Sequence, residues 1–368
     1  MLDILNKPIE LEEVNNAIKE LKLGKAAGED NILNEFLKSA QLPLVTLVSK
    51  LFNLYLDYGI YPWNTTLVCP LHKKGCPHNP DNYRAISIGS NLGKLFSSIL
   101  LQRLLLFRAQ YCPDTVNQQG FCKNAQTSDH IFTLNTCIEK YIDKEKTRLF
   151  GCFVDFQKAF DTVCRDALLF KLYELGIKGK MFNCITYMYQ HSKAKLKMVK
   201  KLSKVIEIQA GTEQGHPLSP ELFKCYILEL SQRLNNIHGI NVPILNKAEV
   251  SHLLWADDLV ILALDKDSMQ IMINELNAFC EEWGLLQIAN CSYYCGTCTK
   301  QCKLTSFVVT SDPRIIVQSE TKVDPNSDKL YPSSDVRTRL HLPDFHTMLN
   351  IGPPGNYQES SIWPNSST

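Results

Sequence analysis

Two adjacent carboxylates, Asp257 and Asp258, stand between two apolar runs in the segment Trp255-Ala256-Asp257-Asp258-Leu259. Ionised acids beside buried strands repel each other and lose hydration, so they persist when a cation compensates them. Mg²⁺ takes oxygen ligands, commonly one or two carboxylates together with substrate phosphates. The pair therefore indicates a divalent-metal site. Because Asp is also favoured at hairpin turns, the two acids taken alone are equally well interpreted as ordinary turn residues.

A metal site at this turn needs a further acid, because neighbouring residues of a strand point to opposite faces of the sheet. Asp155 is the best candidate, since it ends the apolar run Phe150-Gly151-Cys152-Phe153-Val154, which is typical of a buried strand. The two positions are far enough apart in the chain to end neighbouring strands of one sheet. We therefore expect Asp155 to lie beside the Asp257 turn.

The elements that must position these acids are visible as apolar periodicity. Helical stripes are expected in the first 145 residues from Leu11, Val14, Ile18 and Leu21, from Leu44, Leu47, Val48, Leu51 and Tyr55, and from Leu92, Leu95, Phe96 and Ile99. Further on, we expect a strand at 149–154, a helix that starts at Ser219 as N-cap, a hairpin that places Asp257 at its turn, and a helix from about 268 to 283 that ends at Gly284. Strands and helices without strict alternation predict an α+β fold.

Global composition narrows the function classes. The chain has 368 residues, with 39 Lys and Arg against 38 Asp and Glu and a net charge of +1, so any anionic partner must be attracted by a local patch. No run approaches the ~20 apolar residues that span a bilayer, so we expect no membrane partner. The 14 Cys are mostly scattered, which is typical of reduced thiols in an intracellular protein.

A lysine-rich segment could supply such a patch. From Lys193 to Met198 lysines alternate with apolar residues, which predicts a strand with one basic face, as half of a hairpin. We expect this segment to track a phosphate backbone without sequence preference. The residues concerned are Lys193, Lys195, Lys197, Lys200 and Lys201. A merely solvated hairpin face is the alternative.

Composition changes near residue 286. Residues 286–368 are rich in Pro, Ser and Thr and keep no period, so we expect a disordered tail. Its four clustered cysteines, with spacing C-x3-C-x2-C-x3-C, come close to common zinc spacings without matching them. These are Cys291, Cys295, Cys298 and Cys302.

Several ordered blocks resemble the motifs of reverse transcriptases. Three resemble the palm motifs of that family, namely Val154-Asp155-Phe156-Gln157-Lys158-Ala159-Phe160-Asp161, Gly211-Thr212-Glu213-Gln214-Gly215-His216-Pro217-Leu218-Ser219-Pro220 and Trp255-Ala256-Asp257-Asp258. Three resemble its fingers motifs, namely Pro70-Leu71-His72-Lys73-Lys74-Gly75, Asn82-Tyr83-Arg84-Ala85-Ile86-Ser87 and Gln119-Gly120-Phe121. Lys25-Ala26-Ala27-Gly28-Glu29-Asp30 and Glu281-Glu282-Trp283-Gly284-Leu285 are similar to the LINE-type, non-LTR retrotransposon branch.

The resemblance covers about residues 8 to 285 and implies the architecture of a right-hand polymerase. Residues 1–145 would form a mostly helical fingers region, and residues 146–285 a palm with a ferredoxin-like antiparallel sheet. After Leu285 the family continues with a primer-grip hairpin and a thumb, whereas here the pattern is lost, so we expect the thumb to be missing. The implied function is an RNA-directed DNA polymerase that acts on an RNA template, a DNA primer and deoxynucleoside triphosphates, with nuclear action.

The resemblance also implies roles for individual residues. Asp155 and Asp257 would be the principal ligands of two Mg²⁺ ions, or Mn²⁺ in their place, with Asp258 in support. Implied contacts to the incoming nucleotide come from Lys73 or Lys74 and Arg84 at the triphosphate, Phe160 as a steric gate at the sugar, and Gln214 and Gly215 at the nascent base pair. Without the resemblance, these would be exposed cations, a core aromatic and an ordinary turn.

Two other functions remain open from the sequence. One is a truncated, catalytically silent retrotransposon relic that only binds nucleic acid; the other is a metal-dependent nuclease built on the same acids. The chain departs from the family at Cys122, where an arginine is usual, and at Trp255, where a smaller ring is commoner.

Overall fold

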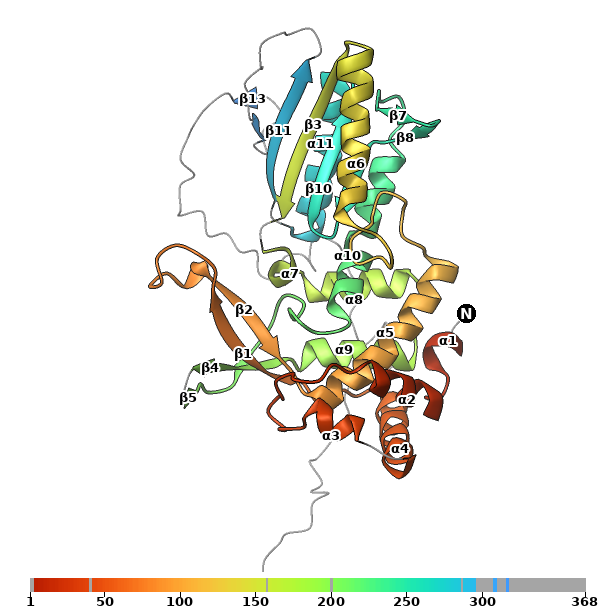
Figure 1. Ribbon diagram of the computed structural model, residues 1–368, viewed down its shortest axis with the longest axis vertical. Helices are drawn as coiled ribbons and strands as arrows, with labels where there is room; N and C mark the ends of the chain where they lie inside the picture. Colours follow the sequence, from red (N-terminus) through yellow and green to blue (C-terminus); the bar gives the residue numbers. More distant parts are fainter. Residues whose placement is uncertain are drawn as a thin grey trace, which may run out of the picture.

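The computed structural model describes residues 3–39, 42–156, 158–198 and 201–285, and beyond them the backbone of three strands (Figure 1). Helices and strands follow one another without regular alternation, and the strands form two main sheets. This arrangement confirms the α+β prediction. None of the described helices combines the length and the apolar character that crossing a bilayer requires.

Helices dominate the N-terminal part, as predicted. They are α1 (Asp3–Asn6), α2 (Leu11–Glu20), α3 (Asn34–Lys38), α4 (Leu42–Tyr58), α5 (Asn91–Tyr111) and α6 (Thr127–Ile138), which continues as the π-type turn η2 (Glu139–Lys144). Of the stripe expected for α2, Val14 and Ile18 are buried, whereas Leu11 is 44% exposed. The stripe expected for α4 is correct only in part: Val48 is buried and Leu44 and Tyr55 pack against the core, but Leu47 is 63% exposed. The helix instead centres its buried face on Val45, Phe52 and Leu56.

A mixed sheet lies between these helices in the chain. Its strands before residue 145 were not predicted from the sequence. It contains β1 (Thr65–His72), β2 (Tyr83–Ile88), β4 (Lys193–Met198), β5 (Lys201–Leu202) and β6 (Ile206–Glu207), with the short 3-10 helix η1 (Pro80–Asn82) before β2. β1 pairs antiparallel with β2 and parallel with β4. β4 and β5 form the predicted hairpin of the lysine-rich segment.

The second sheet is antiparallel and carries the predicted acids. Its strand order is β13-β12-β11-β3-β10-β9, with β3 (Arg148–Phe156), β9 (His252–Trp255) and β10 (Asp258–Ala263) as its N-terminal members. The predicted disordered tail contributes the described backbone of β11 (Gln287–Cys295), β12 (Phe307–Val309) and β13 (Ile316–Val317). Its remaining residues, and the side chains of its four clustered cysteines, lie outside the described part of the chain.

Four longer helices follow β3, namely α8 (Arg165–Glu174), α9 (Lys180–Gln190), α10 (Ser219–Asn235) and α11 (Lys266–Trp283), of which α10 and α11 contact this sheet. The short α7 (Ala159–Thr162) comes directly after β3, and the hairpin of β7 (Ile244–Leu245) and β8 (Ala248–Glu249) precedes β9. α10 begins one residue earlier than predicted, because Leu218 is its N-cap and Ser219 its first residue. α11 ends at Gly284, in the left-handed conformation that was predicted.

Each face of the antiparallel sheet has its own core. Val154, Leu259 and Ile261 belong to the large core that α8, α10 and α11 share. Leu149 and Leu262 point to the other face and pack with Cys137 of α6. Because side chains alternate along a strand, Asp155 and Asp258 lie on this second face, at the end of β3 and β10 remote from Leu149. The sheet therefore presents acids at the open end of a face that α6 covers elsewhere.

Candidate active site

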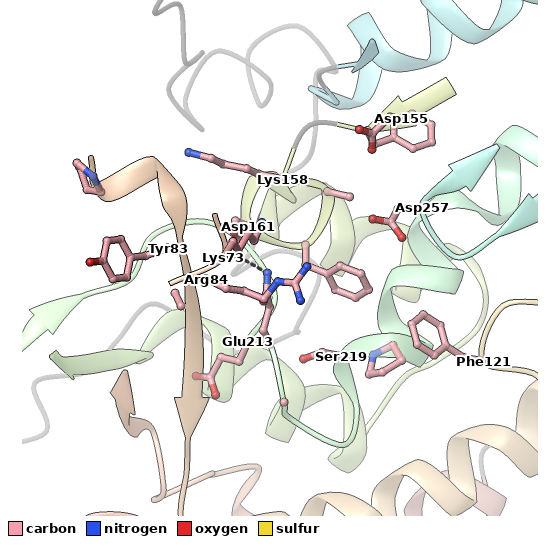
Figure 2. Close-up of a pocket in the computed structure, with 18 residues that line it drawn as sticks. Lys73, Tyr83, Arg84, Phe121, Asp155, Lys158, Asp161, Glu213, Ser219 and Asp257 are labelled. Atoms are coloured by element: carbon pink, nitrogen blue, oxygen red, sulfur yellow. Dashed lines mark hydrogen bonds between the residues drawn. The ribbon is translucent and has the colours of Figure 1, made fainter. Parts of the chain in front are cut away.

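The acids meet at the end of β3 and β10, as the sequence analysis expected. β3 and β10 are neighbouring antiparallel strands, and Asp155 and Asp258 are paired directly across them. Ala256 and Asp257 form the two-residue turn between β9 and β10, with Ala256 in the left-handed region at φ 58°. This turn takes Asp257 out of the strand alternation, so it lies beside Asp155 on the wall of a cavity (Figure 2).

The negative charge of the three acids is not neutralised by any ion pair within the described residues. Burial raises the pKa of Asp257, and the charges of Asp258 and Asp155 raise it further. The pKa of Asp258 is raised for the same two reasons, burial and the charge of Asp155. The site thus favours a bound cation, which would relieve the repulsion.

Close packing fixes the turn that carries Asp257. The segment around Gln118 and Gly120 lies against it: Gln119 N donates to Leu254 O at 3.0 Å, and the Gln118 side-chain carbonyl accepts from Gly120 N at 2.7 Å and Ala256 N at 3.2 Å. A Cβ on Gly120 would lie 2.1 Å from Ala256 N. Only glycine therefore fits at this position, which explains the Gln-Gly-Phe block in structural terms.

A buried charge cluster anchors the loop that leads to Gly120. It consists of Arg108 on α5, Asp114 in the loop, and Glu221 and Lys224 on α10. Lys224 Nζ lies 2.8 Å from Asp114 and 2.9 Å from Glu221, and Arg108 contacts both acids. The Cys122 thiol lies 3.9 Å from Lys224, so a buried lysine stands next to the position where an arginine is usual in the family that the sequence resembles.

The cavity has a volume of about 840 Å³ and opens between the two sheets. It is lined by Lys73, Pro80, Tyr83, Arg84, Ala85, Phe121, Asp155, Phe156, Lys158, Ala159, Phe160, Asp161, Glu213, Gln214, Gly215, Ser219, Pro220 and Asp257. Figure 2 shows Asp155 and Asp257 together on one side, with the guanidinium of Arg84 directed into the middle. Cations and acids therefore face one space, which is large enough for a small-molecule ligand.

An aromatic stack holds Phe160 at the cavity wall. Its ring stacks on that of the fully buried Phe223, with 4.6 Å between centroids and 27° between planes. Phe121 meets the same ring edge to face at 6.3 Å. The Phe160 ring is therefore held in the cavity wall by contacts with two neighbouring rings.

The segment with Gln214 and Gly215 is held against β2 and α7. Gln214 Nε2 donates to Asp161 Oδ1 at 3.2 Å, and Ser87 N donates to Gln214 O at 3.3 Å. Gly215 has φ 97°, and a Cβ there would lie 3.2 Å from Ser87 O. Arg165 donates to the carbonyls of Gly211 and Tyr189, at 3.0 Å and 2.7 Å, and so fixes the start of this segment.

Some predicted site residues lie elsewhere. Asp258 and Lys74 are absent from the cavity lining, although Asp258 faces Asp155 across the strands. Lys195 is engaged by Glu29, whereas Lys197 and Lys201 are exposed and Lys193 is half-buried. Lys200 lies outside the described residues.

Several residues of the lining were not predicted from the sequence to belong to the site. Lys158 and Asp161 belong to the same block as Asp155, and Glu213 and Ser219 to the block of Gln214. Burial raises the pKa of Asp161 and of Glu213. Because each of these residue types is common in exposed loops, the residue type alone did not indicate a site. Their place inside a matched block was the only signal in the sequence that could have identified them.

The donor set fits a hard cation that shares its coordination with a substrate. Across the part of the chain that the structure describes, no three His, Cys, Asp or Glu side chains converge as a protein-only metal site. Asp155 and Asp257 are instead two carboxylates on the wall of an open cavity. Mg²⁺ is commonly held in this way, by one or two carboxylates and substrate phosphates.

Comparison with known proteins places this cavity inside a conserved family model. Residues 71–290 match the model of the family "Reverse transcriptase (RNA-dependent DNA polymerase)". This range includes all the residues that line the cavity.

The chain is also similar in sequence to individual proteins whose names refer to transposable elements. The chain is 28% identical over 291 residues to the "Probable RNA-directed DNA polymerase from transposon BS" of Drosophila melanogaster, across 76% of this chain and 31% of that protein. It is 31% identical over 259 residues to the "Retrovirus-related Pol polyprotein from type-1 retrotransposable element R2" of Popillia japonica, across 70% of this chain and 35% of that protein. The namesake protein of Nasonia vitripennis is 28% identical, with 74% and 26% covered. The matches therefore span about a third of the length of these curated relatives.

Proposed function

Because this chain belongs to the reverse transcriptase (RNA-dependent DNA polymerase) family, we propose that its cavity catalyses RNA-directed DNA synthesis. The observation that carries the proposal is the meeting of Asp155 and Asp257 on a cavity wall that also holds Lys73, Arg84 and Phe160. Five residues from four separate motifs thus converge on one space. We assign residues 1–145 to fingers and residues 146–285 to a palm.

Asp155 and Asp257 are the proposed ligands of two Mg²⁺ ions, with Asp258 supporting from the paired strand position. When bound, the ions supply activation of the primer 3′-hydroxyl and stabilisation of the leaving pyrophosphate. The three acids provide the negative charge that retains them. The raised pKa values of Asp257 and Asp258 reflect the cost of holding these acids close together without a cation.

The remaining wall of the cavity orients a nucleoside triphosphate. Arg84 and Lys73 offer donors to its phosphates and offset the charge that develops there. Phe160, held by Phe223, places an aromatic edge at the sugar and excludes a 2′-hydroxyl by steric contact. Gln214, fixed by Asp161, and Gly215 face the nascent base pair.

The template and primer complete the proposal. An RNA template and a DNA primer would pass over the acid end of the antiparallel sheet, and the exposed Lys197 and Lys201 would contact the phosphate backbone. The site of action would be the nucleus. A membrane partner is not part of the proposal.

Primer extension tests the proposal. The wild-type chain, given a poly(rA) template, an oligo(dT) primer, dTTP and Mg²⁺, should extend the primer, and Asp257→Asn should abolish extension while primer–template binding persists. Asp267→Asn, which changes an exposed acid in the first turn of α11, is the matched control and should retain full activity. Binding without extension by the wild type would instead identify a silent relic, and cleavage without triphosphates would identify a nuclease.

A further inference from the structure

Helix α4 has a second apolar face that the protein buries only in part. Its buried face consists of Val45, Val48, Phe52 and Leu56, which pack into the main core toward α2 and α9. The second face is formed by Leu44, Leu47, Leu51, Leu54 and Tyr58. Leu47, Leu54 and Tyr58 are 63%, 49% and 74% exposed, whereas Leu51 is half-buried and Leu44 packs in part against the main core, so the open part of this face runs from Leu47 to Tyr58. α4 lies at the periphery of the molecule, near one end of its long axis (Figure 1).

The spacing of this second face is that of a coiled-coil seam. From Leu44 to Tyr58 the apolar residues alternate at intervals of three and four, which places them at positions a and d of two heptads. The seam extends over about 21 Å at 1.5 Å per residue. Exposed leucines scattered singly are normal in proteins, whereas a continuous a and d seam has the pattern that a partner helix recognises.

The residues beside the seam define the direction of the partner. One flank, at the e positions, carries Val48 and Tyr55, which are buried or half-buried against the protein's own body. The free flank, at the g positions, carries the exposed charges Lys50 and Asp57. In a parallel pair the g residues would face e residues, which are covered here. In an antiparallel pair the g residues face the g residues of the partner, so the free flanks of the two copies meet on one side of the seam and the covered e flanks lie on the other.

We propose that α4 pairs antiparallel with α4 of a second copy of this chain, across a two-fold axis. The a and d positions then form layers in which Leu51 faces Leu54 of the second copy and Leu47 faces its Tyr58. In the same register Lys50 lies opposite Asp57 of the second copy. Because of the two-fold symmetry, the dimer contains two such ion pairs. The surface is thus complementary to itself in shape and in charge.

The charges select a second copy over other occupants. Lys50 makes no ion pair within the described residues, and Asp57 contacts only Lys180, at 2.6 Å, while 58% of its side chain remains exposed. An unrelated helix would need its own matched acid and base at this spacing, whereas a second copy supplies both. The inference is independent of polymerase activity.

The size of the seam predicts a weak dimer. Stable complexes bury about 800 Å² on each partner, and a seam of two heptads provides less. We therefore expect a dissociation constant of about 10 to 100 µM. Sedimentation velocity of the full chain in reducing buffer, over a concentration series of about 1 to 300 µM, should show a monomer–dimer equilibrium in this range.

Substitutions test the seam itself. Leu54→Glu places a charge in two layers of each dimer and should raise the dissociation constant by about 30-fold or more. Leu106→Glu, at a leucine of α5 that is 64% exposed, is the matched control and should leave the equilibrium unchanged. A chain that stays monomeric throughout the series, or a dimer that Leu54→Glu does not weaken, overturns the proposal.

Mixing two charge reversals tests the register. In a dimer of Lys50→Glu, an acid faces an acid at both ends of the seam, and in a dimer of Asp57→Lys a lysine faces a lysine at both ends. Each variant should therefore dimerise about 10-fold more weakly than the wild type. An equimolar mixture restores attraction at both ends and should form a heterodimer as strong as the wild-type dimer. Thermal melts of each variant monitor folding. A mixture that associates no better than either variant alone overturns the antiparallel arrangement.

Discussion

Two groups of acids in this molecule have opposite electrostatic surroundings. In the buried charge cluster, burial alone disfavours the charged form of Asp114, yet Arg108 and Lys224 hold its pKa below the ordinary value. At the end of β3 and β10, burial and mutual repulsion raise the pKa values of Asp257 and Asp258. Both regions remove acids from water, but among the described residues only in the first do protein cations contact them.

The difference separates an internal structural role from a role that needs an outside partner. The charge cluster is complete, so its acids hold α5, α10 and the loop before Gly120 together. The acids of the sheet are incomplete without a cation, and they open to a cavity that also holds Lys73 and Arg84. Substitutions in the two regions should therefore affect different quantities.

The largest expected effect is on catalysis at the sheet. Asp155→Asn removes a proposed metal ligand and should lower kcat/KM for primer extension by about 1,000-fold or more. Because it also removes a repulsion, its thermal midpoint should equal or exceed that of the wild type. Extension assays combined with melting curves check both quantities. Loss of activity through unfolding would contradict the distinction between the two regions.

In the charge cluster the effect should fall on stability. Asp114→Ala leaves Arg108 and Lys224 with one acid fewer in a buried site, and should lower the free energy of unfolding by about 3 kcal/mol. Urea denaturation measures this change, with Asp267→Ala as the exposed control. A loss no greater than that of the control would show that the cluster does not stabilise the fold.

Gly120 connects the two regions, so its substitution should affect both quantities. In Gly120→Ala the new methyl meets Ala256 N and displaces the turn of Asp257, which should cost about 2 kcal/mol of stability and reduce extension about 10-fold. Gly89→Ala is the control, because its Cβ would have ordinary contacts, the nearest at 3.5 Å to Thr66. Full activity of Gly120→Ala would show that the contact does not position the turn.

A smaller effect is expected at Lys171, on the pH dependence of the free energy of unfolding. In the part of the chain that the structure describes, this lysine forms an ion pair with a single acid, Glu229. Burial lowers its pKa to about 8, despite an ion pair of 2.7 Å with Glu229 and the Trp283 ring 3.7 Å away. Between about pH 8 and the ordinary lysine value the unfolded chain holds more protons on this group, so stability should rise with pH across that window, by on the order of 2 kcal/mol. Lys171→Met should remove this rise. An unchanged pH profile in the variant would contradict it.

The sequence allowed the acids and their strands to be predicted because the chemistry is local. Apolar runs that end in Asp155 and surround Asp257 predict strands and a turn, and β3 and β10 are paired as that pattern requires. The matched blocks located most of the cavity lining. Lys158 and Asp161 were within a block but received no role, because their residue type alone does not distinguish a cavity from a loop.

Other features depend on contacts between distant segments. α4 is apolar on several sides, so periodicity could not decide whether Leu47 or Phe52 faces the core; packing against α2 and α9 decides it. The approach of Gly120 to Ala256 joins residues from separate parts of the chain, and no local pattern encodes it. The strands β1 and β2 were missed because Pro70 and the polar residues near Lys73 interrupt their apolar pattern.

Metal binding at the sheet tests the central claim most directly. Mg²⁺ or Mn²⁺ should raise the thermal midpoint of the wild-type chain in a saturable way, because a ligand that binds only the folded state stabilises it. Asp257→Asn should lose this shift, whereas Asp114→Asn, although less stable, should keep it. An equal shift in Asp257→Asn and the wild type, or no shift in the wild type, would contradict the assignment of these acids to a metal site.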